Sequence, residues 1–261
     1  MDKQTKRNRR FKNVFDSIKS NEKEPRPGCK DIWNSFMVKG ASFSSNDIPI
    51  CPCTATSLPD GLIPFDEAKT IYNKAVKSKK LDFHDNRFVH FYIDDYKFDS
   101  PQNGIWTEYE QALSIIQHFG GIITPDFSTN VDFPDGLKRF NTYRMRAFGY
   151  WAGKQGVSVI NNVRWGTVET WEYCFDGIPT NSIVCIGVVA SGLRYTENRN
   201  LFEFGFIELI NRLKPHTIIF YGSANYEFIN NILQGRNIRI ISFPSKTNLA
   251  YERRKIDEQS S

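Results

Sequence analysis

Acidic residues follow two apolar runs, close to the points where strands are predicted to end. Asp94 and Asp95 follow the run at 88–93, and Asp126 comes two residues after the run at 121–124. Because sites in parallel α/β folds form at the carboxyl ends of strands, we expect these carboxylates at one edge. Clustered carboxylates hold Mg²⁺ or divide into a general acid and a general base. The pattern predicts a catalytic site, and turn or helix-capping roles are the alternative.

Polar and aromatic residues after other predicted strands can bind a substrate at the same edge. Ser128 closes the PDFS phrase, Arg164 and Trp165 follow the run at 157–160, and Tyr221 ends another apolar run. An arginine binds phosphate or carboxylate through its planar fork, and a tryptophan stacks on a base or a sugar. We therefore predict that these four residues contact the substrate, although each type is also common in purely structural roles.

Two more candidates lie at the start of a long predicted helix. Asn141 and Arg144 are three residues apart near the beginning of the helix predicted at 137–154, so they share one face. They can point to the site and bind an anion at the helix start. In the alternative interpretation, the arginine is solvated or pairs with a surface acid.

The cysteines and histidines give little support for a cofactor. The five cysteines are an odd number in a long chain, which is not typical of a secreted disulfide scaffold. Cys51 and Cys53 are separated by one residue, whereas zinc sites usually have longer spacers. His90 lies within an apolar run, which favours a hydrogen-bonded core histidine. The cofactor is therefore unknown from the sequence, and a divalent cation such as Mg²⁺, held by the acids, is possible.

The first part of the chain is strongly basic. Residues 1–30 contain ten Lys or Arg and four Asp or Glu, whereas the remaining residues are almost neutral. Within this arm, Arg7, Arg9, Arg10 and Lys12 surround an aromatic residue. Segments of this kind bind nucleic acid through its phosphates. The alternative is a solvated amphipathic helix with one apolar stripe.

The elements that must position these residues alternate regularly after about residue 66. Helices are predicted at 66–79, 105–118, 137–154, 200–213 and 225–233, and strands at 88–93, 121–124, 157–160, 182–189, 217–221 and 238–242. A short strand is also expected near Ile48–Ile50, within an otherwise irregular stretch at 30–65. This alternation predicts an α/β fold of mostly parallel strands. The chain length favours a (β/α) barrel, possibly incomplete, over an open doubly wound sheet.

The chain divides into an arm, a body and a tail. We expect a basic N-terminal arm at 1–27, a single α/β domain at 28–248 and a C-terminal tail at 249–261. The N-terminus has no apolar run of the kind found in a signal peptide, and no stretch of about 18 apolar residues occurs. These features predict a cytoplasmic protein without a membrane partner.

Several phrases together resemble a known family. They are HFYIDDYKF at 90–98, GIITPDFS at 121–128, FNTYRMRAFGYW at 140–151, CFDGIP at 174–179, FEFGFIELINRLKP at 202–215 and IIFYG at 218–222. In this order they resemble the family called domain of unknown function 4417, over about residues 60–225. The resemblance implies an association with phages and other mobile elements of bacteria, and it implies no particular activity. The basic arm and the Cys-Pro-Cys segment fall outside this range.

Two classes of function follow from these observations. The first is an enzyme, with Asp94, Asp95 and Asp126 as catalytic residues, that hydrolyses or transfers a phosphate- or sugar-containing substrate such as a nucleotide or nucleic acid. The second is a non-catalytic module that binds nucleic acid or a host protein through the basic arm. The position of the three acids distinguishes them, because the enzyme requires them to face one cavity.

Overall fold

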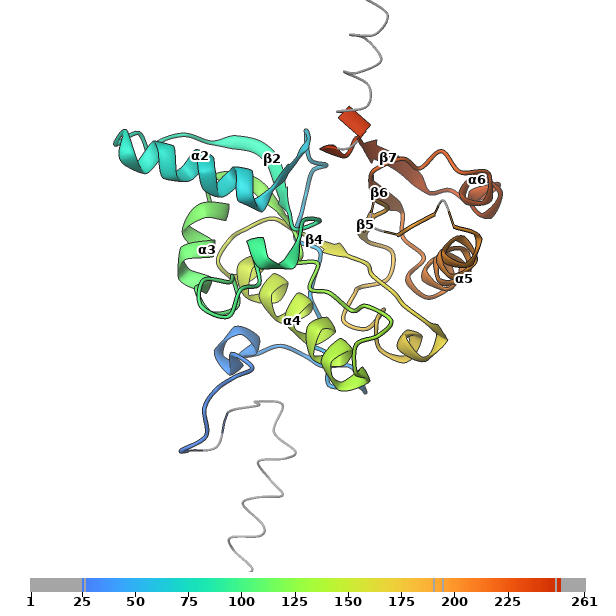
Figure 1. Ribbon diagram of the computed structural model, residues 1–261, viewed down its shortest axis with the longest axis horizontal. Helices are drawn as coiled ribbons and strands as arrows, with labels where there is room; N and C mark the ends of the chain where they lie inside the picture. The colour runs from blue at the N-terminus through green and yellow to red at the C-terminus, as the bar shows by residue number, and fades with distance from the viewer. Residues whose placement is uncertain (1–24, 26, 190, 194, 247, 250–261) are drawn as a thin grey trace, which may run out of the picture.

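A computed structural model describes residues 25, 27–189, 191–193, 195–246 and 248–249 (Figure 1). Its centre is a seven-stranded parallel sheet in which the strands lie in the order of the chain. The strands are β1 (Leu62–Pro64), β2 (Asp85–His90), β3 (Phe119–Ile123), β4 (Val159–Asn162), β5 (Ile183–Gly187), β6 (Thr217–Tyr221) and β7 (Arg239–Phe243).

Helices connect the strands and cover one face of the sheet. They are α2 (Phe65–Lys77), α3 (Tyr109–Ile116), α4 (Asp135–Lys154), α5 (Thr196–Leu213) and α6 (Glu227–Leu233), with short 3-10 helices η1 (Ser35–Val38), η2 (Asp95–Lys97) and η3 (Val168–Glu172). Figure 1 shows α2, α3 and α4 beside the first strands and α5 and α6 beside the last.

The sheet curls into an incomplete barrel, which confirms the predicted fold class. The strand order never reverses, so the reversal point that defines an open doubly wound sheet does not occur. The near-continuous Val and Ile content of the strands agrees with their burial on both faces. All residues of β4 and β6 are buried, for example.

Side chains alternate between the two faces of the sheet and build three cores. The outer face packs against the helices in two clusters, one around Phe148 of α4 and one around Phe206 of α5. The inner face carries a smaller cluster around Ile123, Ile160 and Cys185, to which none of the described helices contributes a buried residue. The helices therefore lie outside, and the concave face stays open toward the carboxyl ends of the strands.

An irregular segment passes between the bases of β4 and β5. The amide of Thr54 donates to the carbonyl of Val159 at 3.0 Å, and the Val159 amide donates to the Thr54 hydroxyl at 2.9 Å. Cys53 and Ile183 of β5 pack against the same inner cluster. Consequently β4 pairs with β5 only through its last two residues, Asn161 and Asn162.

The structure also corrects several predicted boundaries. The stretch at 30–65, predicted to be irregular, contains β1, whereas only an isolated bridge forms near the strand expected at Ile48–Ile50. The predicted helix at 105–118 is shorter, because α3 begins at Tyr109. Strand β2 ends at His90, so three residues separate it from Asp94. Among the described residues, no helix has both the length and the apolar character needed to cross a bilayer.

Candidate active site

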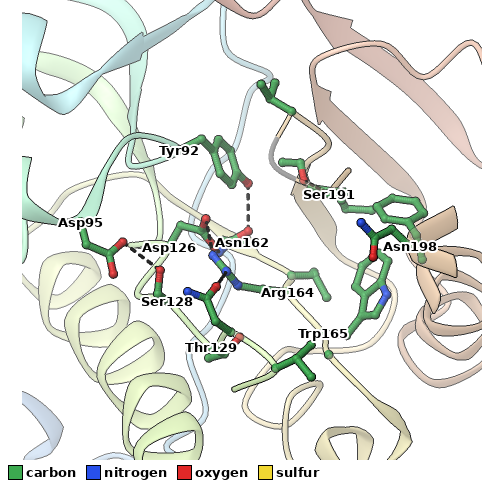
Figure 2. A pocket seen from close by; sticks show the side chains of 18 of the residues that line it. Tyr92, Asp95, Asp126, Ser128, Thr129, Asn162, Arg164, Trp165, Ser191 and Asn198 are labelled. Atoms are coloured by element: carbon green, nitrogen blue, oxygen red, sulfur yellow. Dashed lines mark hydrogen bonds and ion pairs between the residues drawn. The ribbon is translucent and has the colours of Figure 1, made fainter. Parts of the chain in front are cut away.

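A cavity of about 710 Å³ opens at the carboxyl ends of β2, β3, β4 and β5 (Figure 2). Its volume falls within the range of about 300–1,000 Å³ that is typical of small-molecule sites. One side, which we call the acidic wall, consists of Asp94, Asp95, Asp126, Ser128, Asn162 and Arg164. The other side, which we call the aromatic wall, consists of Trp165, Val189, Ser191, Asn198, Leu201 and Phe202.

The carboxylate of Asp126 is held at both oxygens. Asn162 Nδ2 donates to Oδ1 at 2.8 Å, and Arg164 Nη1 donates to Oδ2 at 2.9 Å. Arg164 also donates to Oδ1 of Asn130 at 3.1 Å, and Asn162 accepts a hydrogen bond of 2.9 Å from the Tyr92 hydroxyl. This chain of contacts, visible in Figure 2, fixes the Asp126 side chain in one orientation.

Asp95 has different surroundings. Its Oδ1 accepts a single hydrogen bond of 3.0 Å from the Ser128 hydroxyl. Burial raises the pKa of Asp95, and the charges of Asp126 and Asp99 raise it further, although Ser128 partly opposes them. A carboxyl group with a raised pKa keeps its proton to a higher pH and can therefore donate it. The two acids thus face one cavity with different electrostatic environments.

Asp94 borders the same cavity but points toward solvent. Its side chain is 65% exposed, and its carboxylate lies 3.3 Å from the ammonium of Lys97. An exposed ion pair of this kind contributes little to stability. The structure therefore brings all three predicted acids to one cavity, with Asp94 at its rim.

Tyr92 lies across the inner face of the sheet and lines the cavity. Its ring lies against Gly187 of β5, where an added Cβ would come within 2.5 Å of the ring. Burial raises the pKa of the Tyr92 hydroxyl well above its ordinary value, and the nearby Cys185 and Asp126 raise it further. The hydroxyl consequently remains a hydrogen-bond donor and keeps Asn162 oriented toward Asp126.

Trp165 is the centre of the aromatic wall. Its ring packs at 4.8 Å from the ring of Phe202, and an added Cβ on Gly205 of α5 would come within 2.1 Å of it. The helix can therefore accommodate the indole only because residue 205 has no side chain. This contact positions Trp165 as a wall of the cavity, as predicted from its place after β4.

Three predicted substrate-binding residues lie outside the cavity lining. Arg144 forms two hydrogen bonds with Asp99, at 2.6 and 2.8 Å, and stacks on Phe127. Asn141 donates to the backbone carbonyl of Ser128 and accepts from Arg144. These two residues support the loop that carries Asp126 and Ser128 from behind. Their direct role in substrate binding stays a prediction.

The third of these residues, Tyr221, packs inside the barrel. Its ring lies 5.3 Å from that of Tyr92 and 4.2 Å from that of His90. Nδ1 of His90 accepts the Tyr92 amide at 3.1 Å, which agrees with the predicted core histidine. The predicted nucleic-acid contacts Arg7, Arg9, Arg10 and Lys12 lie outside the described residues.

No group of three or more His, Cys, Asp or Glu side chains within the described residues is arranged to hold a metal ion. Both oxygens of Asp126 are already engaged by Asn162 and Arg164, so this acid would have to exchange partners to bind a cation. Cys51 belongs to the outer core and Cys53 packs against the inner one, so the two thiols do not form a pair. The divalent cation stays a prediction.

Sequence reasoning did not place Tyr92, Asn198 and Phe202 in the site. Asn162, like Arg164, follows the apolar run at 157–160, so its place after a predicted strand was a signal for this edge. Tyr92 lies within the predicted strand at 88–93, where an aromatic residue is typical of a core position. Asn198 and Phe202 come from α5, whose approach to β4 depends on the curl of the sheet.

The sequence profile of the family described as Domain of unknown function (DUF4417) matches residues 41–244. The chain belongs to this family. The matched region contains every residue that lines the cavity. It also contains Cys51 and Cys53, which the resemblance had placed outside the family region.

Two phage proteins resemble this DUF4417 chain. The Gene 1 protein of Mycobacterium phage D29 is 32% identical over 202 residues, which cover 77% of the chain and 69% of that protein. The Gene 1 protein of Mycobacterium phage L5 is 34% identical over 139 residues, which cover 53% of the chain and 58% of that protein. The chain thus covers less than two thirds of the L5 protein. No solved structure matches it significantly.

Proposed function

We propose that the cavity is the active site of a hydrolase that cleaves a glycosidic bond in a sugar-containing substrate. The supporting observation is that Asp95 and Asp126 line one cavity in unequal environments. Many glycoside hydrolases use two carboxyl groups in this way, one as an acid and one as a base or nucleophile. Unequal surroundings of two carboxyl groups are the feature that assigns those roles.

In this mechanism Asp95 is the general acid. Its raised pKa allows it to donate a proton to the leaving group as the bond from the anomeric carbon breaks. Asp126, oriented by Asn162 and Arg164, accepts a proton from the water whose oxygen forms the new bond to the anomeric carbon. The products are the free sugar and the protonated leaving group, and the next cycle requires the proton to return from Asp126 to Asp95.

The charge of the cavity favours a neutral sugar over a phosphate group. Among the lining residues that the structure describes, there are three carboxylates and one guanidinium, and that guanidinium is already paired with Asp126. No free cation is therefore available among the described lining residues to bind a phosphate ester, whereas a neutral sugar needs none. We therefore favour the sugar-containing substrate of the two classes that the sequence left open.

The test uses chromogenic 4-nitrophenyl glycosides, including the β-ribofuranoside, with the full chain. We expect Asp95→Asn and Asp126→Asn each to lower kcat/KM by about 100-fold or more. The matched control is Asp60→Asn, which removes an exposed carboxylate outside the cavity and should change kcat/KM less than threefold. Failure of the unmodified protein to release nitrophenol, or full activity of either of the first two variants, would contradict the proposal.

A further inference from the structure

We infer that the aromatic wall binds a flat heteroaromatic base of the adenine type, so that the substrate is a nucleoside. The hydrolysis of that nucleoside depends on the proposed function, but binding of the base does not. The inference starts from the contrast across the cavity in Figure 2, where Asp95, Asp126 and Ser128 lie opposite Ser191, Asn198 and Trp165.

The aromatic wall has the composition of a stacking site. Trp165, Val189, Leu201 and Phe202 give it an apolar surface, and none of its six residues carries a charge. The indole of Trp165 is held against Gly205, so its position does not have to be established when a ligand binds. Stacking of a base on such an aromatic ring is favourable for every base, because every base has a flat π face.

Asn198 adds a hydrogen-bonding edge beside this surface. It lies in the first turn of α5, is exposed, and makes one long contact of 3.5 Å from its Nδ2 to the Gly192 carbonyl. A carboxamide offers one acceptor and one donor side by side. This pair matches the exocyclic amine and the adjacent ring nitrogen of adenine, which is the pairing asparagine makes with adenine in nucleic-acid recognition.

The two walls together select a nucleoside and not a nucleotide. A base on Trp165 directs the attached sugar toward Asp95 and Asp126, whose side of the cavity provides acceptors for its hydroxyl groups. Arg199 is not among the lining residues, and its guanidinium donates to the Leu193 carbonyl at 3.1 and 3.2 Å. A 5′-phosphate would thus find no free cation among the described residues that line the cavity.

The experiment measures binding of adenosine, inosine, ribose and AMP to the full chain by isothermal titration calorimetry, with adenine release followed separately by chromatography. We expect adenosine to bind more tightly than ribose or AMP. Trp165→Ala should weaken adenosine binding at least tenfold, and Trp165→Phe should weaken it less, because a flat ring remains. Asn198→Ala should remove the preference for adenosine over inosine. Asn225→Ala, at an exposed asparagine outside the cavity, is the control and should have no effect.

The outcomes separate this inference from the proposed hydrolysis. Adenosine binding that depends on Trp165, without release of adenine or of nitrophenol, would support the base site and contradict the hydrolase. Cleavage of nitrophenyl glycosides without detectable adenosine binding would overturn the base site and leave the hydrolase in place. Unchanged adenosine affinity in Trp165→Ala, or AMP binding more tightly than adenosine, would also overturn the inference.

Discussion

The two walls of the cavity are held in place by different kinds of interaction. The acidic wall depends on directional contacts, in which Asn162, Arg164 and Tyr92 form a connected set of hydrogen bonds around Asp126. The aromatic wall depends on close packing, because the indole of Trp165 fits against α5 only where Gly205 has no side chain. A polar wall is destabilised when a hydrogen-bonding partner is removed, whereas a tightly packed apolar wall is destabilised when atoms are added. The two walls should therefore respond to opposite kinds of substitution.

Arg146 illustrates how far the polar support extends behind the acidic wall. Its fully buried guanidinium donates to the backbone carbonyls of Asp176, Asn162 and Cys174, at 3.1, 3.0 and 3.3 Å. Burial lowers the pKa of Arg146 to about 10, so the group remains a cation at neutral pH. The cation ties the end of β4 to the loop before β5.

The largest effect should come from removing this cation. Arg146→Met retains much of the volume but leaves three buried carbonyls without their donor, so we expect a loss of about 3–5 kcal/mol in the free energy of unfolding. Urea denaturation measures it. Arg236→Met, at an exposed position after α6 where the guanidinium contacts one backbone carbonyl, is the control and should cost less than about 1 kcal/mol. Equal losses of unfolding free energy in the two variants would show that the buried guanidinium stabilises the fold no more than an exposed one.

The next effect concerns His90, which packs against Tyr92 and Tyr221 inside the barrel. Burial lowers the pKa of His90 from 6.5 to about 3, so the folded protein keeps it neutral while the unfolded chain binds a proton below pH 6.5. Stability should therefore be lost as the pH falls from 6.5 toward 3, by up to about 1.4 kcal/mol per pH unit.

The variant that tests this is His90→Asn, whose amide oxygen can still accept the Tyr92 amide. It should flatten the pH dependence of the unfolding free energy in that window, as measured by urea denaturation at several pH values. His84→Asn, at an exposed histidine just before β2, should leave the slope as it is. If the His90 variant retained the full slope, another group would be responsible.

A smaller effect should come from adding a methyl group to the aromatic wall. Gly205→Ala brings a Cβ within 2.1 Å of Trp165, and overpacking of this kind typically costs about 1–3 kcal/mol. Gly136→Ala, in α4, has no neighbour within 4 Å and should stabilise the protein by about 0.5–1 kcal/mol, because alanine favours a helix. Thermal unfolding compares the two, and a shift in the same direction for both would contradict the proposed packing.

The smallest effect should be a gain in stability when Asp95 is replaced by asparagine. Its raised pKa in the fold means that the native protein binds its proton more tightly than the unfolded chain does. Stability is therefore lost as the pH rises through the window between the unfolded and folded pKa values. Asp95→Asn should slightly raise the Tm at neutral pH, and the difference should disappear in acid below the ordinary pKa of an aspartate. A lower Tm at pH 7 would show that the ionised carboxylate is preferred.

Much of the fold could be predicted from local patterns, because long apolar runs identify buried parallel strands. The predicted bounds of β6 are those observed, whereas β1 was not predicted because it has three residues, the last of them a proline. The three acids were found because carboxylates after strands are a visible signal. The partner of Arg144 was not predicted, since pairing with Asp99 depends on how a loop 45 residues away folds back over α4. Contacts such as Tyr92 on Gly187 depend on the curl of the sheet, which has no local signature.

The passage of residues 53–55 between the bases of β4 and β5 has a consequence for how the molecule is assembled. Thr54 occupies the base of β4, so β5 can join it only along Asn161 and Asn162, and a piece of chain from before β1 completes the seam. A nick in the turn at Asn181 would leave Asp126 and Trp165 on one fragment and Gly205 and Phe202 on the other. Neither fragment alone would contain a complete cavity. Recovery of ligand binding on mixing them would therefore directly report the docking of β5 against β4 and Thr54.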